Sequence, residues 1–353
     1  MKLIHCADLH IGSALESIFS QELASERKSE LLRTFKRTVD RAAELNAKAI
    51  MICGDLFDTA NAPKKAGRYI LGVIEEHPEI DFLYVSGNHD PGDLLDQLCI
   101  EDKDKRPENL IIFPNDRWET VRYDNLTVTG ISLTCDSVPP LPPLAPADIN
   151  IVMLHGDIYK LGTKQFENRN IDYLALGHFH SYEAKKLDKR GVYCYCGCLE
   201  GRGFDECGEK GFVLLNTEGS ALSYDFVRSG ARTVRRVECD ITGLVTLKEI
   251  EDSVDRAVSG IGKGDIIRLI LIGQYTVDTE KDLRHIEGML SDRFYFARVK
   301  DESTLEINPD EYKNDISLKG EFIRLAMSDS SLSKEQSDRI ITLGVRALRN
   351  EEL

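Results

Sequence analysis

The stretch Ser86-Gly87-Asn88-His89-Asp90 is the starting point for interpreting this 353-residue chain. It follows Asp81-Phe82-Leu83-Tyr84-Val85, a short apolar run that predicts a buried strand. Gly87 permits backbone angles that other residues resist. Asn88 offers a carbonyl oxygen to a metal, and His89 can bind a metal or transfer a proton. A helix cap or an Asx-turn would explain the stretch equally well, so the other strand ends decide its meaning.

Polar side chains also follow four other apolar runs. The runs and the residues after them are 2–6 with Asp8 and His10, 49–53 with Asp55 and Asp58, 149–154 with His155 and Asp157, and 171–176 with His178 and His180. Ligands of α/β proteins bind at the carboxyl ends of strands. Five strand ends that carry His, Asp or Asn therefore predict one shared site.

The first 230 residues predict a layered α/β domain. Leu31, Phe35, Val39 and Ala42 recur at helical spacing between the first two strands, and Pro63 can open the next helix. This βαβαβ order is typical of a sheet covered by helices. After residue 108 the predicted strands follow more closely, at 110–113, 119–123 and 126–131.

A boundary is expected near 229–233. Beyond it, strands near 234–239, 266–272 and 294–299 alternate with helices near 246–258 and 279–290, which predicts a small βαβαβ unit. Two amphipathic helical stretches follow, and Ser333 with Gln336 forms a capping box for the second. We therefore expect three parts, at 1–230, 231–305 and 306–353.

The composition limits the classes of function. The net charge is −15 and no region is basic, so a role on DNA would need local patches, a dimer groove or a partner. No apolar run reaches the ~18 residues of a membrane span, and the chain opens on a strand rather than a signal peptide. Nine cysteines, mostly in apolar segments, predict reduced thiols in the cytoplasm.

Cys194, Cys196 and Cys198 alternate with other residues and leave two interpretations open. They could form a metal-binding thiolate cluster with Cys207, or they could line one face of a strand. Zinc sites usually use Cys-x₂₋₄-Cys spacing, which favours the strand.

The residues of the five loops indicate a metal centre. Asp, Asn and His supply oxygen and nitrogen ligands that suit manganese, iron, magnesium or zinc. There are more ligands than one ion needs, which points to two. Two metals ~3.5–4 Å apart are a known device for phosphoryl hydrolysis, because they activate a water and hold the phosphate oxygens.

At these residues the chain resembles the calcineurin-like metallophosphoesterases. The family pattern is Asp-x-His, Gly-Asp-x-x-Asp, Gly-Asn-His-Asp/Glu, a lone His and Gly-His-x-His, and all five blocks occur in order across residues 8–180. The resemblance implies a β-sandwich flanked by helices, with a small α/β capping domain and C-terminal helices beyond it.

The resemblance also implies roles for nine residues. One metal would be held by Asp8, His10, Asp55 and His180, and the other by Asp55, Asn88, His155 and His178, with Asp55 bridging. His89 would meet the substrate phosphate, and Asp58 is the expected orienting partner of His89. Some relatives in the DNA-repair branch carry His at the position of Asp58.

A finer resemblance covers nearly the whole chain. The stretches 5–10, 54–58 and Glu200-Gly201-Arg202-Gly203-Phe204-Asp205-Glu206 are similar to the bacterial SbcD-type repair nucleases, which partner SMC-like ATPases in double-strand-break repair. This implies a DNA nuclease that uses two divalent metals, manganese above all, and forms a homodimer through the helices around 63–100.

The resemblance further implies that the C-terminal helices dock on the coiled-coil ATPase, with Phe322, Ile323, Ile340 and Leu343 as exposed contacts. Packing of these helices on the capping domain is the other option. A hydrolase of small phosphodiesters or nucleotides is the alternative enzyme, and a non-catalytic metal-site scaffold is the alternative from another class.

Overall fold

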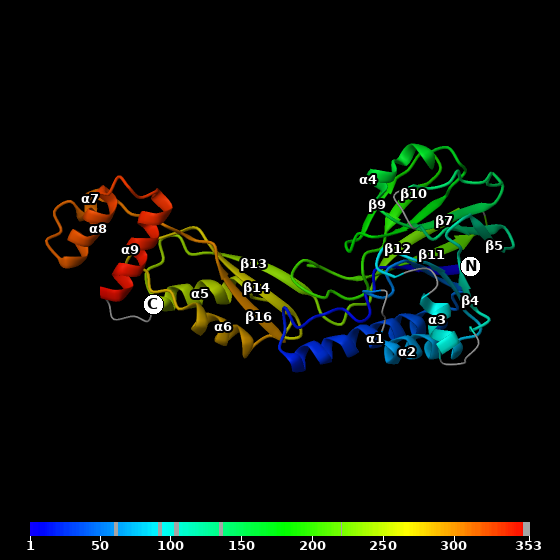
Figure 1. Cartoon of the computed structure of the whole chain (residues 1–353), viewed down its shortest axis with the longest axis horizontal. Helices are drawn as coiled ribbons and strands as arrows, with labels where there is room; N and C mark the ends of the chain where they lie inside the picture. The colour runs from blue at the N-terminus through cyan, green and yellow to red at the C-terminus, as the bar shows by residue number, and fades with distance from the viewer. Residues whose placement is uncertain (60–62, 91–93, 102–105, 134–136, 220, 349–353) are drawn as a thin grey trace. The chain divides into compact units, whose positions relative to one another are not determined.

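The computed structural model describes residues 1–59, 63–90, 94–101, 106–133, 137–219 and 221–348, which divide into two compact units (Figure 1). The first unit spans Met1–Thr233 and the second Val234–Leu353. In these ranges no helix combines the length and the apolar character that crossing a membrane would require.

The first sheet of unit 1 carries three of the five strand-end loops. Its strands, in spatial order, are β12 (Ala221–Arg228), β11 (Gly211–Glu218), β1 (Lys2–Cys6), β2 (Ala49–Cys53), β3 (Asp81–Val85) and β4 (Leu110–Ile112). β1, β2 and β3 pair in parallel, so their carboxyl ends meet at one edge. The residues after β1, β2 and β3 are therefore brought together, as the sequence predicts.

The second sheet carries the other two loops. Its strands, in spatial order, are β5 (Glu119–Tyr123), β6 (Leu126–Gly130), β7 (Ile149–His155), β8 (Tyr173–Gly177), β10 (Val192–Tyr195) and β9 (Glu183–Lys186). β7 and β8 are parallel, with His155 opposite Gly177 at the end of the pairing. His155 and His178 thus emerge side by side.

The two sheets stack face to face as a β-sandwich. Apolar side chains of both sheets form one buried cluster, which includes Leu3, Met51 and Leu83 of the first sheet and Ile151 and Met153 of the second. The alternate residues of the central strands face outward and are buried as well, because helices or loops cover both outer faces. This is the layered α/β architecture that the sequence predicts.

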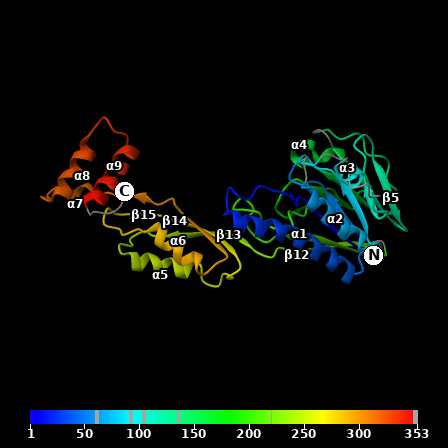
Figure 2. The same ribbon diagram turned by 60° about the horizontal axis from the view of Figure 1, so that its bottom comes forward.

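Three helices cover the outer face of the first sheet: α1 (Gln21–Glu44), α2 (Lys64–Glu75) and α3 (Leu94–Glu101), as Figure 2 shows from below. The predicted stripe of α1 is buried, including Phe35 and Val39. Ser20 caps α1 by accepting a hydrogen bond from the amide of Leu23, which satisfies a donor that the first turn leaves free. Pro63 is the N-cap of α2, as its position in the sequence predicts.

The outer face of the second sheet is covered by short segments. They are α4 (Ile158–Leu161), the 3₁₀ turn η1 (Thr163–Gln165) and the proline-rich stretch, of which residues 137–148 are described and 134–136 lie outside the described residues. Val138, Leu141 and Leu144 pack on the buried cluster of this face. The proline-rich stretch therefore covers part of this face of the sheet.

The cysteines support the strand interpretation. Cys194 lies in β10, Cys196 and Cys198 follow it, and all three are buried with free thiols, while Cys207 is half-buried. Burial raises the pKa of the Cys194 thiol to about 12. In the described residues no group of metal-ligating atoms includes a cysteine, so the thiolate-cluster interpretation finds no support.

Unit 2 is built on a parallel three-stranded sheet. Its strands in spatial order are β13 (Val234–Asp240), β14 (Ile266–Ile272) and β16 (Phe296–Asp301), and the helices α5 (Leu247–Ala257) and α6 (Leu283–Ser291) connect them. Both helices pack on the same face of the sheet, around Leu269 and Leu271. A two-stranded sheet of β15 (Gln274–Tyr275) and β17 (Thr304–Leu305), which the sequence analysis missed, lies beyond them.

The C-terminal helices form a small cluster of their own. They are α7 (Pro309–Tyr312), α8 (Leu318–Ser328) and α9 (Lys334–Leu348). The expectation that Ile323 and Phe322 are exposed is wrong, because Ile323 is fully buried and Phe322 packs against Gly344. Both lie on the face of α8 that meets α9 and Val277.

Other apolar side chains of these helices do face solvent, as expected for Ile340 and Leu343. We call this set the exposed tail surface: Ile316, Leu318, Leu325, Met327, Ile340, Leu343 and Leu348. The helices therefore pack back on unit 2 and still present an apolar surface.

Candidate metal centre

Backbone hydrogen bonds bind the strand-end loops to one another. The amide of Asp8 donates to the carbonyl of Gly54 at 3.0 Å, and the amide of His10 donates to the carbonyl of Asp55 at 2.9 Å. The loop after β1 thus runs beside the loop after β2. Side chains on both loops are held at fixed separation without help from a ligand.

Asp90 fastens the third loop to the second. Its carboxylate accepts hydrogen bonds from the amides of Asp55, Leu56 and Phe57 and from the amide of Gly87, at 2.7 to 3.1 Å. Asp90 therefore ties the two loops together. Asp157 likewise caps α4 by accepting from the amide of Tyr159.

Gly87 is required for a different reason from the one expected. It does not have a positive φ. A Cβ at Gly87 would lie 2.1 Å from Asp55 Oδ1 and 2.5 Å from the Asp55 nitrogen, so only glycine allows the two loops to approach this closely.

Four of the predicted metal ligands themselves hold a left-handed backbone. Asp8, His10, Asp55 and His178 have φ values of 53°, 47°, 50° and 112°. Such conformations cost of order 1–3 kcal/mol each in non-glycine residues and gather at functional sites. The fold tolerates this cost at the residues that carry the chemistry.

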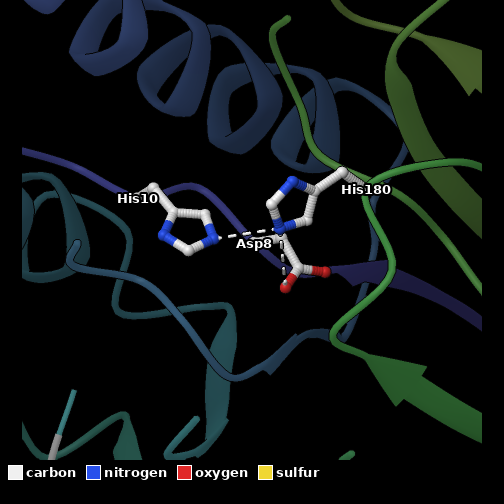
Figure 3. A group of neighbouring side chains, drawn as sticks. All are labelled: Asp8, His10 and His180. Carbon is white, nitrogen blue, oxygen red and sulfur yellow. Dashed lines mark hydrogen bonds and ion pairs between the residues drawn. The ribbon is translucent and has the colours of Figure 1, made fainter. Parts of the chain in front are cut away.

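The first group of side chains comprises Asp8, His10 and His180, whose donor atoms lie within 4.8 Å of one another (Figure 3). The Nε2 atoms of His10 and His180 are 3.2 Å apart, and His180 Nε2 is 4.0 Å from Asp8 Oδ1. Asp55 Oδ2 approaches His10 Nε2 to 3.7 Å. These are the four residues expected around one metal.

The second group continues from the same Asp55 oxygen. Asp55 Oδ2 is 3.4 Å from His155 Nε2. The Asn88 Oδ1 atom lies 2.9 Å from His155 Nε2 and 3.2 Å from His178 Nδ1. The structure thus brings together all seven side chains expected to bind metal, with Asp55 between the two groups.

His89 and Asp58 are in contact, but through an atom that was not expected. The Nδ1 of His89 lies 2.8 Å from the main-chain carbonyl oxygen of Asp58, so this nitrogen carries the proton and donates it. The Asp58 carboxylate turns instead toward His10 Nδ1, 3.0 Å away, and toward Arg202. His10, Asp58 and His89 each place a possible metal-binding atom within 4.8 Å of those of the other two residues.

Burial sets the protonation of the central groups. Burial raises the pKa of Asp8 well above its usual range, and the neighbouring Asp55 charge adds to this. Burial also lowers the pKa of His10 to about 2, helped by the positive Arg202, and lowers the pKa of His155. His10 and His155 are therefore neutral, which is the form that binds metal.

Two residues of the site were missed as functional by sequence reasoning. Arg202 and Glu206 belong to the quoted stretch 200–206, yet nothing in the stretch assigned them a role. Glu206 Oε1 lies 2.7 Å from His180 Nδ1, and Arg202 reaches Glu206, Asp58 and Ser13. The sequence signal that could have pointed to Glu206 is weak: it is an acidic residue that follows the Gly-His-x-His block and the strand that carries Cys194.

His5 of β1 is a packed histidine outside the two groups of metal-binding side chains. It is fully buried, with Nδ1 3.0 Å from the Tyr173 hydroxyl. Burial lowers its pKa to about 3.

The donor set fits divalent cations. Asp8 and Asp55 are only 0% and 2% exposed and lie beside each other. The Nε2 atoms of His10 and His180 lie only 3.2 Å apart. Two buried carboxylates beside each other repel when both are charged, and a cation among these oxygen and nitrogen donors would offset that repulsion.

Residues 1–182 match the family described as calcineurin-like phosphoesterase, and the chain belongs to this family. The expected family is therefore confirmed, and with it the α/β sandwich fold. Membership makes the chain a metal-dependent phosphoester hydrolase whose cofactors are two divalent metal ions.

Curated relatives match over most of the chain at low identity. The metallophosphoesterase YhaO of Bacillus subtilis (strain 168), described as uncharacterized, is 25% identical over 296 residues, which cover 77% of this chain and 72% of the relative. The DNA double-strand break repair protein Mre11 of Sulfolobus acidocaldarius is 24% identical over 314 residues, covering 80% and 77%.

Solved structures resemble the chain at lower identity still. TT1561 of Thermus thermophilus is 14% identical with a TM-score of 0.42, covering 64% of this chain and 99% of that one. A dimetal phosphatase from Danio rerio is 11% identical with a TM-score of 0.44, covering 65% and 96%.

Proposed function

We propose that this protein is a two-metal phosphodiesterase that cleaves DNA. Asp8, His10, Asp55 and His180 hold one metal, and Asp55, Asn88, His155 and His178 hold the other. The observation that carries this proposal is the position of the Asp55 Oδ2 atom, within 3.7 Å of His10 Nε2 and 3.4 Å of His155 Nε2. A carboxylate can bridge two cations, which an imidazole or an amide cannot do.

The metals would supply an activated water and positive charge for the phosphate oxygens. We propose Mn²⁺ as the native ion. The ligands are oxygen and nitrogen atoms only, which suit Mn²⁺ and are also used by Fe, Mg and Zn. Chelator should abolish hydrolysis and Mn²⁺ should restore it. Asp55→Ala should lose metal and activity together, and full turnover of stripped protein in chelator would refute the two-metal proposal.

His89 would contribute to the phosphate chemistry without binding metal. Its Nδ1–H is fixed by the Asp58 carbonyl, and the ring is exposed and stands edge to face with His10 at 4.8 Å. Its Nε2 is thus available to bind a phosphate oxygen or to protonate the leaving oxygen. Asp58 acts as the orienting residue through its main chain.

DNA as the substrate is supported by relatives and by a row of arginines. Several relatives are described as Mre11 DNA repair proteins. In unit 2, Arg236, Arg268 and Arg298 lie directly opposite one another on β13, β14 and β16. This arginine row is on the sheet face opposite α5 and α6. It is the local positive feature that an acidic protein would need.

Like charges paired across strands destabilise a sheet, which an anionic ligand would offset. Arg236 lies 3.3 Å from Glu238, and Arg298 lies 2.7 Å from Glu287. The two arginine side chains remain about half exposed, at 54% and 52%. Phosphates would therefore compete with these acids for exposed guanidinium groups.

A charge-swap experiment tests the substrate. The double variant Arg236→Glu/Arg298→Glu should weaken DNA binding and reduce the salt slope by roughly 0.9 for each DNA phosphate that is no longer neutralised. The control Lys248→Glu/Arg293→Glu changes the charge equally on the helical side of the sheet. Both variants should cleave a small chromogenic phosphodiester normally. If the two double variants weakened DNA binding equally, or if the protein cleaved small phosphodiesters but not DNA, the small-molecule phosphodiesterase would be favoured.

We further propose two protein partners and a location. A second copy would pair through the helices around 63–100, of which 91–93 lie outside the described residues. An SMC-like coiled-coil ATPase would dock on the exposed tail surface, because helix-on-helix docking needs apolar side chains in solvent. Free buried thiols such as Cys6 and Cys53 support a reducing cytoplasm.

A further inference from the structure

The segment 200–206 contacts the outer side of the first group of metal-binding side chains, which comprises Asp8, His10 and His180. Glu206 is 5% exposed, and its Oε1 atom lies 2.7 Å from the Nδ1 of His180. Arg202 Nη2 lies 3.3 Å from the same nitrogen, so the Glu206 carboxylate and the Arg202 guanidinium together hold this edge of the ring. The opposite nitrogen, Nε2, is the atom that faces His10 and Asp8.

His10 has a carboxylate behind it as well. Its Nδ1 is 3.0 Å from Asp58 Oδ1, an electrostatic contact rather than a hydrogen bond. Both histidines of this group thus have a carboxylate at the outer nitrogen, and both direct Nε2 toward the same point.

Arg202 joins these two carboxylates. It donates from Nη2 and Nε to Glu206 Oε1 at 2.5 and 2.9 Å, and from Nη1 to Asp58 Oδ1 at 3.1 Å. The Ser13 hydroxyl accepts a further hydrogen bond from Nη1 at 3.0 Å. A planar guanidinium fixes the separation of the acids it joins, so the two rings are held as one unit.

The second group lacks this support. The outer nitrogen of His155 contacts a neutral oxygen, the carbonyl of Cys53, at 2.9 Å. Within the described part of the chain, no carboxylate lies at ion-pair distance from either nitrogen of His178 or from His155 Nδ1. A carboxylate at the outer nitrogen of a metal-binding imidazole raises the basicity of that ring more than a carbonyl at the same place does.

We infer that Glu206 and Arg202 are positioning residues for the first metal and make its site the tighter of the two. They fix the ring orientation of His180 and, through Asp58, that of His10. The inference rests on the ligand assignment proposed above and adds an order of filling: Asp8, His10, Asp55 and His180 bind the first equivalent of metal, and the other group binds the second.

Calorimetric titration of the metal-stripped full chain with Mn²⁺ tests this directly. The parent should bind two ions in two steps. Glu206→Gln keeps the size of the side chain but removes its charge, and should weaken the tight step by roughly 10–100-fold while the weak step changes little. Glu206→Asp should recover part of the affinity, and Arg202→Lys should fall between the parent and Glu206→Gln.

Glu200→Gln is the matched control. Glu200 lies in the same segment and is similarly buried, at 2%, but its carboxylate binds Arg27, Thr34 and the amides of residues 231 and 232, and not a metal-binding histidine. Glu200→Gln should lower the melting temperature and leave both Mn²⁺ steps unchanged.

The outcomes separate the two levels of inference. Equal weakening of Mn²⁺ binding in Glu206→Gln and Glu200→Gln would reduce Glu206 to a folding role and overturn the inference. Two-step binding in the parent with an unchanged tight step in Glu206→Gln would overturn it too, while leaving the two-metal proposal standing. Binding of fewer than two ions by the parent would overturn both.

Discussion

Gly87→Ala is a one-carbon test of how closely the second and third loops must approach. The new Cβ would lie 2.1 Å from Asp55 Oδ1, whereas an ordinary contact begins near 3.4 Å, so Asp55 or its loop must move by about 1.3 Å. Overpacking of this kind costs about 1–3 kcal/mol. In a unit of 233 residues each kcal/mol lowers the melting temperature by about 2–4 °C.

The loss of activity should exceed the loss of stability. Asp55 is the carboxylate proposed to bridge the metals, and a displacement of about 1 Å at a catalytic group can cost ~10²-fold in rate. The assay is kcat/KM for a chromogenic phosphodiester at saturating Mn²⁺, alongside a thermal melt followed by circular dichroism. Most of the variant should still be folded at the assay temperature.

Gly72→Ala provides the control. Gly72 lies in α2, and a Cβ there meets no atom within 4 Å. The substitution should raise the free energy of unfolding by about 0.8–1 kcal/mol through helix propensity and leave turnover unchanged. Parental turnover and metal content in Gly87→Ala would refute the close approach of the loops.

Other expectations concern single residues and assembly. His89→Ala should reduce turnover by ~10²–10⁴-fold with metal content unchanged, and loss of metal would mean that His89 is a ligand. His5 takes up its proton near pH 6.5 in the unfolded chain but only near pH 3 in the folded chain. Lowering the pH from 7 to 5 should therefore cost about 2 kcal/mol of stability. Denaturant titrations of His5→Gln should show a correspondingly smaller loss of stability over the same pH range. Light scattering should give about twice the 39.7 kDa chain mass, and a single-chain mass at high concentration would contradict the dimer. Leu325→Glu/Leu343→Glu should abolish binding to the coiled-coil ATPase without affecting phosphodiester turnover; unchanged binding would exclude the exposed tail surface.

The strand-end motifs could be predicted because each is local. An apolar strand followed by Asp, Asn or His is visible in a few consecutive residues, and parallel pairing of strands brings such ends together. The sequence therefore identified the seven residues that the structure gathers around Asp55. It also predicted β14 at Ile266–Ile272 with the correct bounds.

The supporting contacts could not be predicted, because they join distant parts of the chain. Arg202 meets Asp58 across 144 positions and Ser13 across 189, and no local pattern encodes such pairs. The sequence analysis expected Asp58 to orient His89. A sequence does not show whether the side-chain carboxylate or the main-chain carbonyl of a residue makes such a contact, and here it is the carbonyl.

Helical spacing likewise predicts which residues share a face but not what covers it. Phe322 and Ile323 are adjacent on α8, and only the packing of α9 and Val277 against them decides that both are covered.

The Glu200 carboxylate has a practical consequence for protein engineering. It accepts hydrogen bonds from the amides of Ala231 and Arg232, which lie just before unit 2 begins at Val234. A chimera that exchanges unit 2 with that of a relative should therefore be joined after Thr233. A junction at 229, where the boundary predicted from the sequence begins, would separate the buried Glu200 carboxylate from its native partners at 231 and 232. The hybrid should then be insoluble for reasons unrelated to the compatibility of the exchanged parts.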